Sequence, residues 1–388
     1  MPRMIYFDYN ATTPLDPAVR EAMLPFLGEF WGNPSSIHRI GRKARALLDD
    51  ARDRAATFLG AKPSEIIFTS GGTEANNLAV LGTARALKAK GKHLITSAIE
   101  HHSVLQGFDY LEEKEGFSVT RLPVDLAGRV SVDELKNALR QDTVLVSIMA
   151  ANNEIGTLQP VAEIGKVCHE RGVVFHTDAV QWFGKEPFLN IKQFNADMVS
   201  VCAHKFHGPK GAGLLYIKAP FHPDPLFFGG GHENDRRAGT ECLSNIVGLT
   251  VAMEMFVKTP VFSCVQLEPL LKKLHKVVEK IEGCELVSSK AGSLKNTLAF
   301  TVSGADSVSL IAALDVEGIY ASSGSACSAG SLNPSHVVMA LGKKEKGNSL
   351  IRFSLGRESS EADVDYVCAS LPEIIQRSQR GSKPVKTL

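Results

Sequence analysis

Two glycines that follow an apolar run are suited to binding an anion. Gly71 and Gly72 follow the run that ends at Thr69, and Thr73 then opens a helical pattern. Glycines let backbone N–H groups approach an anion, and a helix N-terminus adds partial positive charge. The segment therefore predicts a phosphate cradle, with a tight strand-to-helix turn capped by Thr73 as the alternative. It is not a P-loop, because no Gly-Lys-Ser/Thr follows.

An aspartate and a lysine end two later apolar runs. Asp178 comes after the run that begins at Val173, and Lys205 follows the run Met198–Cys202. In doubly wound folds, ligands bind at the carboxyl ends of the strands. A lysine at the end of a buried strand is costly unless it is neutral, paired or covalently used, and a Schiff-base lysine meets that condition. Taken singly, Asp178 could cap a helix and Lys205 could extend into solvent.

Together the three segments describe a pyridoxal phosphate site. A carboxylate keeps the pyridine nitrogen protonated, so that the ring can act as an electron sink, and the lysine carries the cofactor. The order of phosphate cradle, Asp178 and Lys205 is therefore more specific than any one segment.

A fourth segment, residues 321–335, is rich in Ser, Ala and Gly and carries Cys327. Because its near neighbours are small, Cys327 is the least suited of the seven cysteines to a hydrophobic core. An exposed thiol can be partly thiolate and act as a nucleophile. The segment predicts a mobile loop with a reactive cysteine, with a flexible linker and an incidental cysteine as the alternative.

Alternating helical and apolar segments must position these residues. The strand candidates are near-continuous apolar runs, as expected when helices cover both faces of a parallel sheet. The predicted helices are Pro17–Phe30, Arg42–Leu59, Glu74–Lys88, Val161–Arg171, Asn245–Phe256 and Val265–Ile281, and the predicted strands are Glu65–Thr69, His93–Ser97, Val144–Met149, Val173–His176, Met198–Cys202, Gly213–Ile217, Asn296–Val302 and Leu350–Phe353.

The pattern changes near residue 257, after which come a long helix, a few strand candidates and more helices. We predict a large domain over residues 15–257 and a smaller α+β domain over residues 258–380, which carries Cys327. Residues 1–14 are candidates to join the small domain, and residues 379–388 are expected to fray.

The composition argues against several classes of protein. Among 388 residues, 43 Lys and Arg against 42 Asp and Glu give a net charge of +1, which argues against binding nucleic acid or an anionic membrane through bulk charge. No run approaches the ~18 apolar residues of a membrane span, and the N-terminus has no signal-peptide core. The cysteines never form a Cys-x-x-Cys pair, so we expect a reducing, cytoplasmic setting. The pair His101-His102 lacks a third ligand at a suitable spacing, so no metal site is expected.

Motifs spread over nearly the whole chain point to one family. They run in order from residue 6 to residue 357: Tyr6–Pro14, Gly32–Ser36, Gly71–Glu74, Glu100-His101, Asn152–Gly156, Asp178–Gln181, His204–Gly211, Arg237–Thr240, Ser323–Cys327 and Arg352–Arg357. With them the chain resembles a cysteine desulfurase of the NifS/IscS type, in the class V aminotransferase family of pyridoxal phosphate enzymes. The Ser-Gly-Ser-Ala-Cys loop that ends at Cys327 is the most discriminating motif. The resemblance implies an aspartate-aminotransferase-like α/β fold of type I, with a mostly parallel sheet covered by helices and a smaller α+β C-terminal domain.

The resemblance also implies roles for the site residues. Lys205 holds the cofactor and moves protons at the substrate α-carbon, and Cys327 attacks the substrate sulfur. The other implied contacts are Asp178 with the ring nitrogen, Gln181 with the ring hydroxyl, His101 stacked on the ring and shuttling the thiol proton, Gly72, Thr73 and His204 with the phosphate, Thr240 with the phosphate in the other subunit, Asn153 beside the cofactor, and Asn153 and Arg352 with the substrate carboxylate. A planar guanidinium suits that last task.

The implied activity is the removal of sulfur from L-cysteine, which gives L-alanine and a persulfide on Cys327. The sulfur would pass to an acceptor, such as an iron–sulfur scaffold protein or a partner in thio-cofactor or tRNA synthesis, and the enzyme would be a homodimer. Two alternatives are another reaction in the same fold, by a class V aminotransferase or a selenocysteine lyase, and a non-catalytic scaffold that docks partners.

Two positions depart from the family pattern. Cys202 stands where the family usually has a serine that donates to the cofactor phosphate. A thiol is a weaker donor, so we expect looser retention of the cofactor. Asn234-Asp235 stands where the family usually has Arg-Gly, which puts in doubt a positive charge near the dimer interface.

Overall fold

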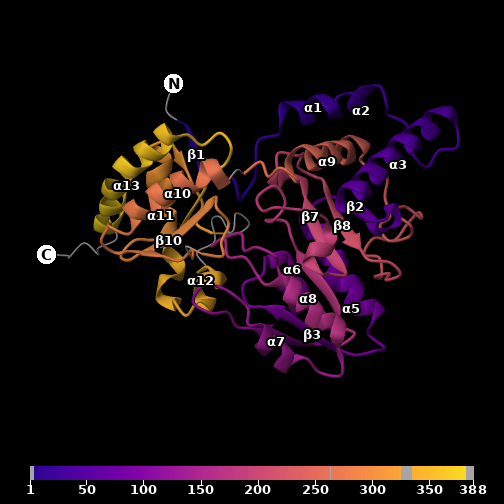
Figure 1. Ribbon diagram of the computed structural model, residues 1–388, viewed down its shortest axis with the longest axis horizontal. Coiled ribbons are helices and arrows are strands. Elements are labelled where there is room, and N and C mark those ends of the chain that lie inside the picture. Colours follow the sequence, from indigo (N-terminus) through magenta and orange to yellow (C-terminus); the bar gives the residue numbers. More distant parts are fainter. Residues whose placement is uncertain (1–3, 263, 290, 325–333, 382–388) are drawn as a thin grey trace.

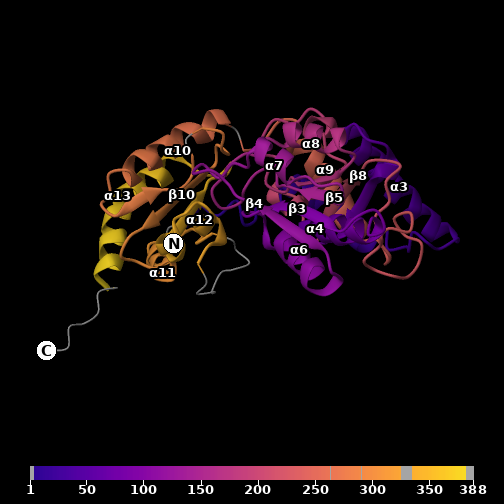
Figure 2. The same cartoon turned by 90° about the horizontal axis from the view of Figure 1, so that it is seen from below.

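The computed structural model describes residues 4–262, 264–289, 291–324 and 334–381. Two lobes lie side by side in Figures 1 and 2. The large lobe is built on a seven-stranded sheet and the small lobe on a three-stranded sheet. Cys327 lies outside the described residues.

The sheet of the large lobe is mostly parallel, as predicted. Its order is β2-β8-β7-β6-β5-β3-β4, and only β8 runs antiparallel to its neighbours. The strands are β2 (Ile66–Thr69), β3 (His93–Ser97), β4 (Ser118–Leu122), β5 (Thr143–Ser147), β6 (Val174–Asp178), β7 (Met198–Cys202) and β8 (Gly213–Ile217). Every residue of β2, β3, β5, β7 and β8 is buried, because helices cover both faces.

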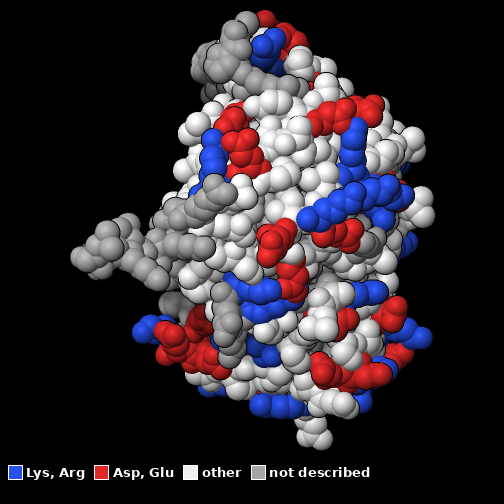
Figure 3. Space-filling view, turned by 90° about the vertical axis from the view of Figure 1, so that its left-hand side faces the viewer, with Lys and Arg blue, Asp and Glu red and all other residues white. Residues whose placement is uncertain are grey.

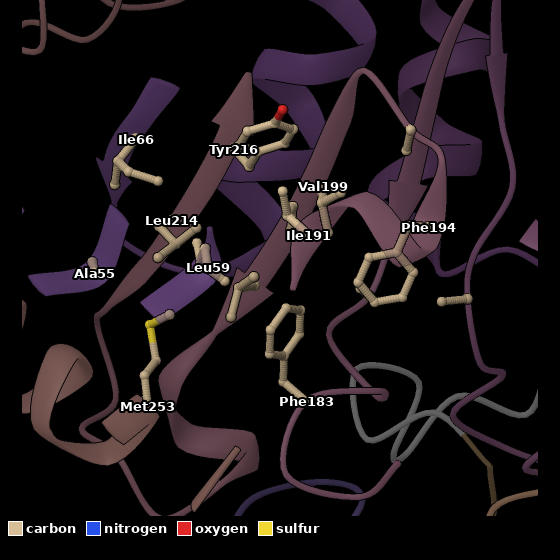
Figure 4. Close-up of a cluster of buried hydrophobic side chains, with 14 of the residues drawn as sticks. Ala55, Leu59, Ile66, Phe183, Ile191, Phe194, Val199, Leu214, Tyr216 and Met253 are labelled. Atoms are coloured by element: carbon tan, nitrogen blue, oxygen red, sulfur yellow. The ribbon is translucent and has the colours of Figure 1, made fainter. Parts of the chain in front are cut away.

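Alternate strand residues pack on opposite sides of this sheet. Ile66 and Val199 join a cluster with α3, α8 and α9 on one face (Figure 4), and Ile67 and Met198 join another with α4 and α6 on the other face. The helices of the large lobe are α1 (Pro17–Met23), α2 (Pro25–Gly28), α3 (Arg39–Leu59), α4 (Gly72–Asn77), α5 (Thr83–Ala86), α6 (His102–Glu115), α7 (Val132–Ala138), α8 (Val161–Glu170) and α9 (Leu243–Phe256).

Each of the six predicted helices differs from the observed one in its bounds or continuity, and three of the differences show how. The first breaks at Leu24 into α1 and α2, because Pro25 has no N–H to continue a helix and begins a new one instead. The helix predicted over Glu74–Lys88 is interrupted by a π-helical turn, Leu78–Gly82. The third helix, α3, begins before the predicted Arg42, at a cap formed by His38.

The small lobe contains an antiparallel sheet of order β12-β10-β9 and a parallel pair, β1 with β11. Its elements are β1 (Ile5–Tyr6), β9 (Cys284–Leu286), β10 (Thr297–Val302), β11 (Ile319–Tyr320), β12 (Leu350–Ser354), α10 (Cys264–Val278), α11 (Ser307–Val316), α12 (His336–Ala340) and α13 (Glu361–Gly381). Ile5, Phe7 and Tyr9 pack in the hydrophobic cluster of this lobe together with Phe262, whereas Val257 packs in that of the large lobe. The domain division at residues 257/258 stays a prediction, and these memberships support it.

The surface of the small lobe carries both signs of charge. Figure 3 shows Lys and Arg side chains interspersed with Asp and Glu. Two of the ion pairs in this lobe join Arg377 to Glu317 and Lys273 to Asp365. Across the described ranges, no helix combines the length and apolarity that a bilayer crossing requires.

Candidate active site

One cavity opens at the carboxyl ends of β6 and β7 and reaches the small lobe. Because parallel strands end at the same edge of a sheet, Asp178 and Lys205 meet there, and Arg352 arrives from β12. Most predicted site residues line this cavity: Gly72, Thr73, His101, Asn153, Asp178, Gln181, Cys202, His204, Lys205 and Arg352.

The turn between β2 and α4 forms the glycine wall of the cavity. Gly71 has a φ of +156°, and a Cβ on Gly72 would lie 2.8 Å from Cγ2 of Val180, so a larger residue at position 72 would displace a stiff side chain. A second hollow adjoins the first and shares four of its residues, Gly72, Thr73, Cys202 and His204. It also includes Lys210, and this combination of glycine backbone and lysine suits a phosphate group.

The carboxylate of Asp178 is buried and held by two N–H groups. Asn76 donates from Nδ2 to Oδ2 at 2.7 Å, and the backbone N–H of Val180 donates to Oδ1 at 2.9 Å. Asn76 also donates to Ser103 at 2.9 Å. Asn76 was not among the predicted site residues. Its position in the helix that begins at Gly72, beside the predicted phosphate cradle, could have indicated that it lies near the site.

His101 caps α6 and faces the cavity as a neutral ring. Its Nδ1 accepts from the backbone N–H of Ser103 at 3.1 Å and lies 2.8 Å from the Ser103 hydroxyl. Burial lowers the pKa of His101, and Lys205 lowers it further, while Asp178 acts in the opposite direction. A neutral imidazole can accept a proton from a bound thiol.

The amine of Lys205 is held by the N-terminal segment. Lys205 lies in the 3-10 turn Ala203–Lys205 directly after β7. Its Nζ donates to the backbone carbonyls of Asn10 and Ala11, each at 2.8 Å. Two peptide oxygens therefore aim the amine into the cavity, and both come from almost 200 residues earlier in the chain.

Two side chains that flank Lys205 are uncharged. Burial, with Lys205 and Lys210 next in effect, lowers the pKa of His204 to about 3, and its Nδ1 lies 3.0 Å from the hydroxyl of Thr12. Burial raises the pKa of the Cys202 thiol. A bound phosphate would therefore meet neutral groups here, with Lys205 and Lys210 as the nearby cations.

Arg352 is buried, and the protein itself satisfies most of its guanidinium. Its Nη2 pairs with Oδ1 of Asp8 at 2.6 Å, and Nη1 donates to the carbonyls of Asn153 at 2.9 Å and Gly324 at 2.7 Å. Asn153 and Arg352 thus lie together, and their contact with a substrate carboxylate stays a prediction. A substrate carboxylate at Arg352 would share the guanidinium with Asp8, which the sequence reasoning missed.

Thr240 lies away from this cavity, in a separate hollow with Glu233 and Arg237. Beside it, Glu233, Asn234 and Asp235 have φ values of +51°, +56° and +62°. L-residues adopt this left-handed region at a cost, and the Arg52–Glu233 ion pair, at 2.6 Å, holds the segment in place.

The cavity fits pyridoxal phosphate. It offers a glycine-walled end with a lysine for the phosphate, a buried carboxylate fixed by two donors for a protonated ring nitrogen, and the amine of Lys205 for covalent attachment. The Oδ1 atom of Asn76, buried beside Asp178, has no hydrogen-bond partner within the described chain. A group that binds against Asp178 could supply that partner.

Comparisons with known proteins agree with this assignment. The aminotransferase class-V family profile matches residues 5–367. The cysteine desulfurase IscS of Dictyoglomus turgidum is 46% identical over 97% of this chain and 96% of its own length, and that of Methanosarcina thermophila is 47% identical over 98% and 94%. The solved structure of a NifS-like protein superposes with a TM-score of 0.89 at 37% identity, covering 97% of this chain and all of that one. The chain therefore belongs to the class-V aminotransferase family of pyridoxal phosphate enzymes, and within it to the cysteine desulfurases of the IscS type.

Proposed function

We propose that this enzyme transfers the sulfur of L-cysteine to Cys327 and so releases L-alanine. In the balanced step, the C–S bond of the substrate breaks and an S–S bond forms, so that L-cysteine and the Cys327 thiol become L-alanine and a Cys327 persulfide. The observation that carries the proposal is the convergence of Asp178, Lys205 and Arg352 on one cavity. Arg352 also bonds Gly324, the last described residue before the segment that carries Cys327.

The residues divide the work as follows. Pyridoxal phosphate, when bound, withdraws electrons from the amino acid and weakens the bonds next to the amino group. Arg352 and Asn153 orient the substrate carboxylate, and Lys205 moves the proton at the α-carbon. His101 takes the proton of the substrate thiol at Nε2 in the tautomer whose Nδ1–H donates to the hydroxyl of Ser103, 2.8 Å away. When Nδ1 instead accepts from the backbone N–H of Ser103, the ring proton lies on Nε2.

The partners belong to the same proposal. L-cysteine is the substrate, and an acceptor protein such as an iron–sulfur scaffold takes the persulfide sulfur in the cytoplasm. The chain works as a homodimer in which Thr240 reaches the cofactor phosphate of the partner. The separation of Thr240 from the cavity of its own chain supports that arrangement.

Sulfide and alanine release from L-cysteine, with a thiol reductant present, tests the proposal. We expect turnover by the natural enzyme and its loss in Cys327→Ser, while the yellow colour of the bound cofactor persists. Cys284→Ser, a change in β9 far along the chain from the loop, is the matched control and should retain turnover. Equal turnover in Cys327→Ser would contradict sulfur transfer to Cys327 and would favour transamination or β-elimination.

A further inference from the structure

Lys185 is a buried lysine that the proposed reaction does not use. It follows β6, and its residue is only 2% exposed. Lysine is almost never buried unless it is paired. Its Nζ donates to two amide oxygens, Oδ1 of Asn10 at 2.7 Å and Oε1 of Gln181, and it lies 5.3 Å from the centre of the Phe262 ring. A buried amine held by neutral oxygens is expensive, which calls for a functional reason.

The surroundings of Lys185 disfavour its charge. Burial lowers its pKa well below the ordinary value, and Lys205 and Arg352 lower it further, while Asp8 acts in the opposite direction. Lys185 and Lys205 also share one residue, because Asn10 accepts from Lys185 with its side chain and from Lys205 with its backbone carbonyl. The two amines therefore belong to one network.

Lys185 and the backbone carbonyl of Asn10 together hold the amide of Gln181 in one orientation. The oxygen and nitrogen of a side-chain amide have nearly the same shape, so only hydrogen bonds distinguish the two orientations. Nζ of Lys185 donates to Oε1 and so holds it on the lysine side, and Nε2 donates one hydrogen to the carbonyl of Asn10 at 2.9 Å. One N–H of Gln181 remains, and Gln181 lines the cavity.

We propose that Lys185 is a positioning residue that keeps an N–H of Gln181 directed at the ring hydroxyl of the cofactor. A donor at the ring oxygen stabilises its anionic form, and so lowers the affinity for the proton shared with the nitrogen of Lys205. The proposal rests on the cofactor contact of Gln181 in the proposed function and does not depend on sulfur transfer to Cys327.

The test is a pH titration of the visible absorption band of the bound cofactor, without cysteine. In Lys185→Met we expect the midpoint to rise by about one pH unit, the effect of a hydrogen bond to a charged group. Gln181→Ala should raise the midpoint similarly, and the double variant should show no further rise, because both changes remove the same contact. Lys192→Met, the same substitution at an exposed position, is the matched control and should titrate like the natural protein.

Two results would overturn the proposal. One is an unchanged midpoint in folded, cofactor-loaded Lys185→Met, and the other is a double variant in which the two shifts add. Should Lys185→Met fail to fold, Lys185→Gln is judged by the same criteria, because its shorter side chain cannot span both Asn10 and Gln181. Since no substrate is present, failure of the sulfur-transfer proposal would leave this titration unaffected.

Discussion

Replacement of Cys202 by serine should tighten cofactor binding. Cys202 ends β7 and contributes to both hollows of the site, next to the glycine turn. Its thiol is buried, and burial raises its pKa, so it is uncharged. The backbone N–H groups of Gly72 and His204 are aimed at the sulfur, and the sulfur itself lies 3.8 Å from the carbonyl of Ala212. The thiol donates to the carbonyl of Ala212 in this structure, so Cys202 could offer a bound phosphate only an S–H group that turns away from that weak bond.

The expected gain follows from the difference between the two donors. A hydrogen bond to a charged group contributes ~1.5–3 kcal/mol, and a thiol is a weak donor that recovers only part of this. Serine is slightly smaller than cysteine, and the space that it leaves in this buried position reduces the gain. A net improvement of about 1 kcal/mol corresponds to a roughly fivefold lower Kd for pyridoxal phosphate.

The assay is titration of the apoenzyme with pyridoxal phosphate, followed by the absorbance of the bound cofactor. Cys168→Ser is the matched control, because Cys168 is also buried but packs in the hydrophobic cluster of the large lobe. The control should lose stability and keep its Kd. An unchanged or higher Kd in Cys202→Ser, with the control behaving as stated, would refute the argument that the thiol loosens cofactor retention.

Two further predictions concern stability. Glu233→Gln should lower the free energy of unfolding in urea by roughly 3 kcal/mol, because it breaks a nearly buried ion pair with Arg52 that has two hydrogen bonds. Glu254→Gln, which alters the more exposed pair with Arg54, should lower it by under ~1 kcal/mol. Equal losses in the two variants would contradict this prediction. Burial raises the pKa of Glu100 from 4.5 to about 8. Between these two pH values the folded protein keeps a proton on Glu100 that the unfolded chain releases, so the free energy of unfolding falls as the pH rises from 4.5 to 8. Glu100→Gln should therefore lose less stability than the natural protein between pH 5 and pH 8 in urea unfolding, and parallel pH curves would exclude this role of Glu100.

Most strands of the large sheet could be located from the sequence because they are short apolar runs with polar ends, whereas β4, which is mostly only partly buried, was not predicted. β3, β7 and β8 have the predicted bounds, and β6 differs by a residue or two at its ends. The reversed direction of β8 was not visible, since an apolar run carries no information about its neighbours. The π-helical turn Leu78–Gly82 was not predicted either; it ends at Gly82, where a Cβ would lie 2.5 Å from the carbonyl of Asp224, a close approach that the sequence does not reveal.

The site was predictable where chemistry demands a rare residue at a strand end, as with Asp178 and Lys205. It was not predictable where common residue types hold the site residues in place through hydrogen bonds and ion pairs. Asp8 and Lys185 were not singled out, because their partners, Arg352 and Asn10, lie far away in the sequence. Such supports become visible only through burial and hydrogen bonding.

The N-terminal segment runs from β1 in the small lobe to Lys205 in the large lobe, so the site is complete only when both lobes have folded. β1 pairs with β11, and the backbone N–H of Asn10 donates to Ser354, so the N-terminal segment reaches its place only together with residues 319–354. Closing a loop of this length is slow compared with local folding. While the ribosome is still extending the chain, Lys205 lacks the carbonyls of Asn10 and Ala11 in their final place. The surroundings of Lys205 are therefore complete only once the N-terminal segment has packed against β11 and Ser354.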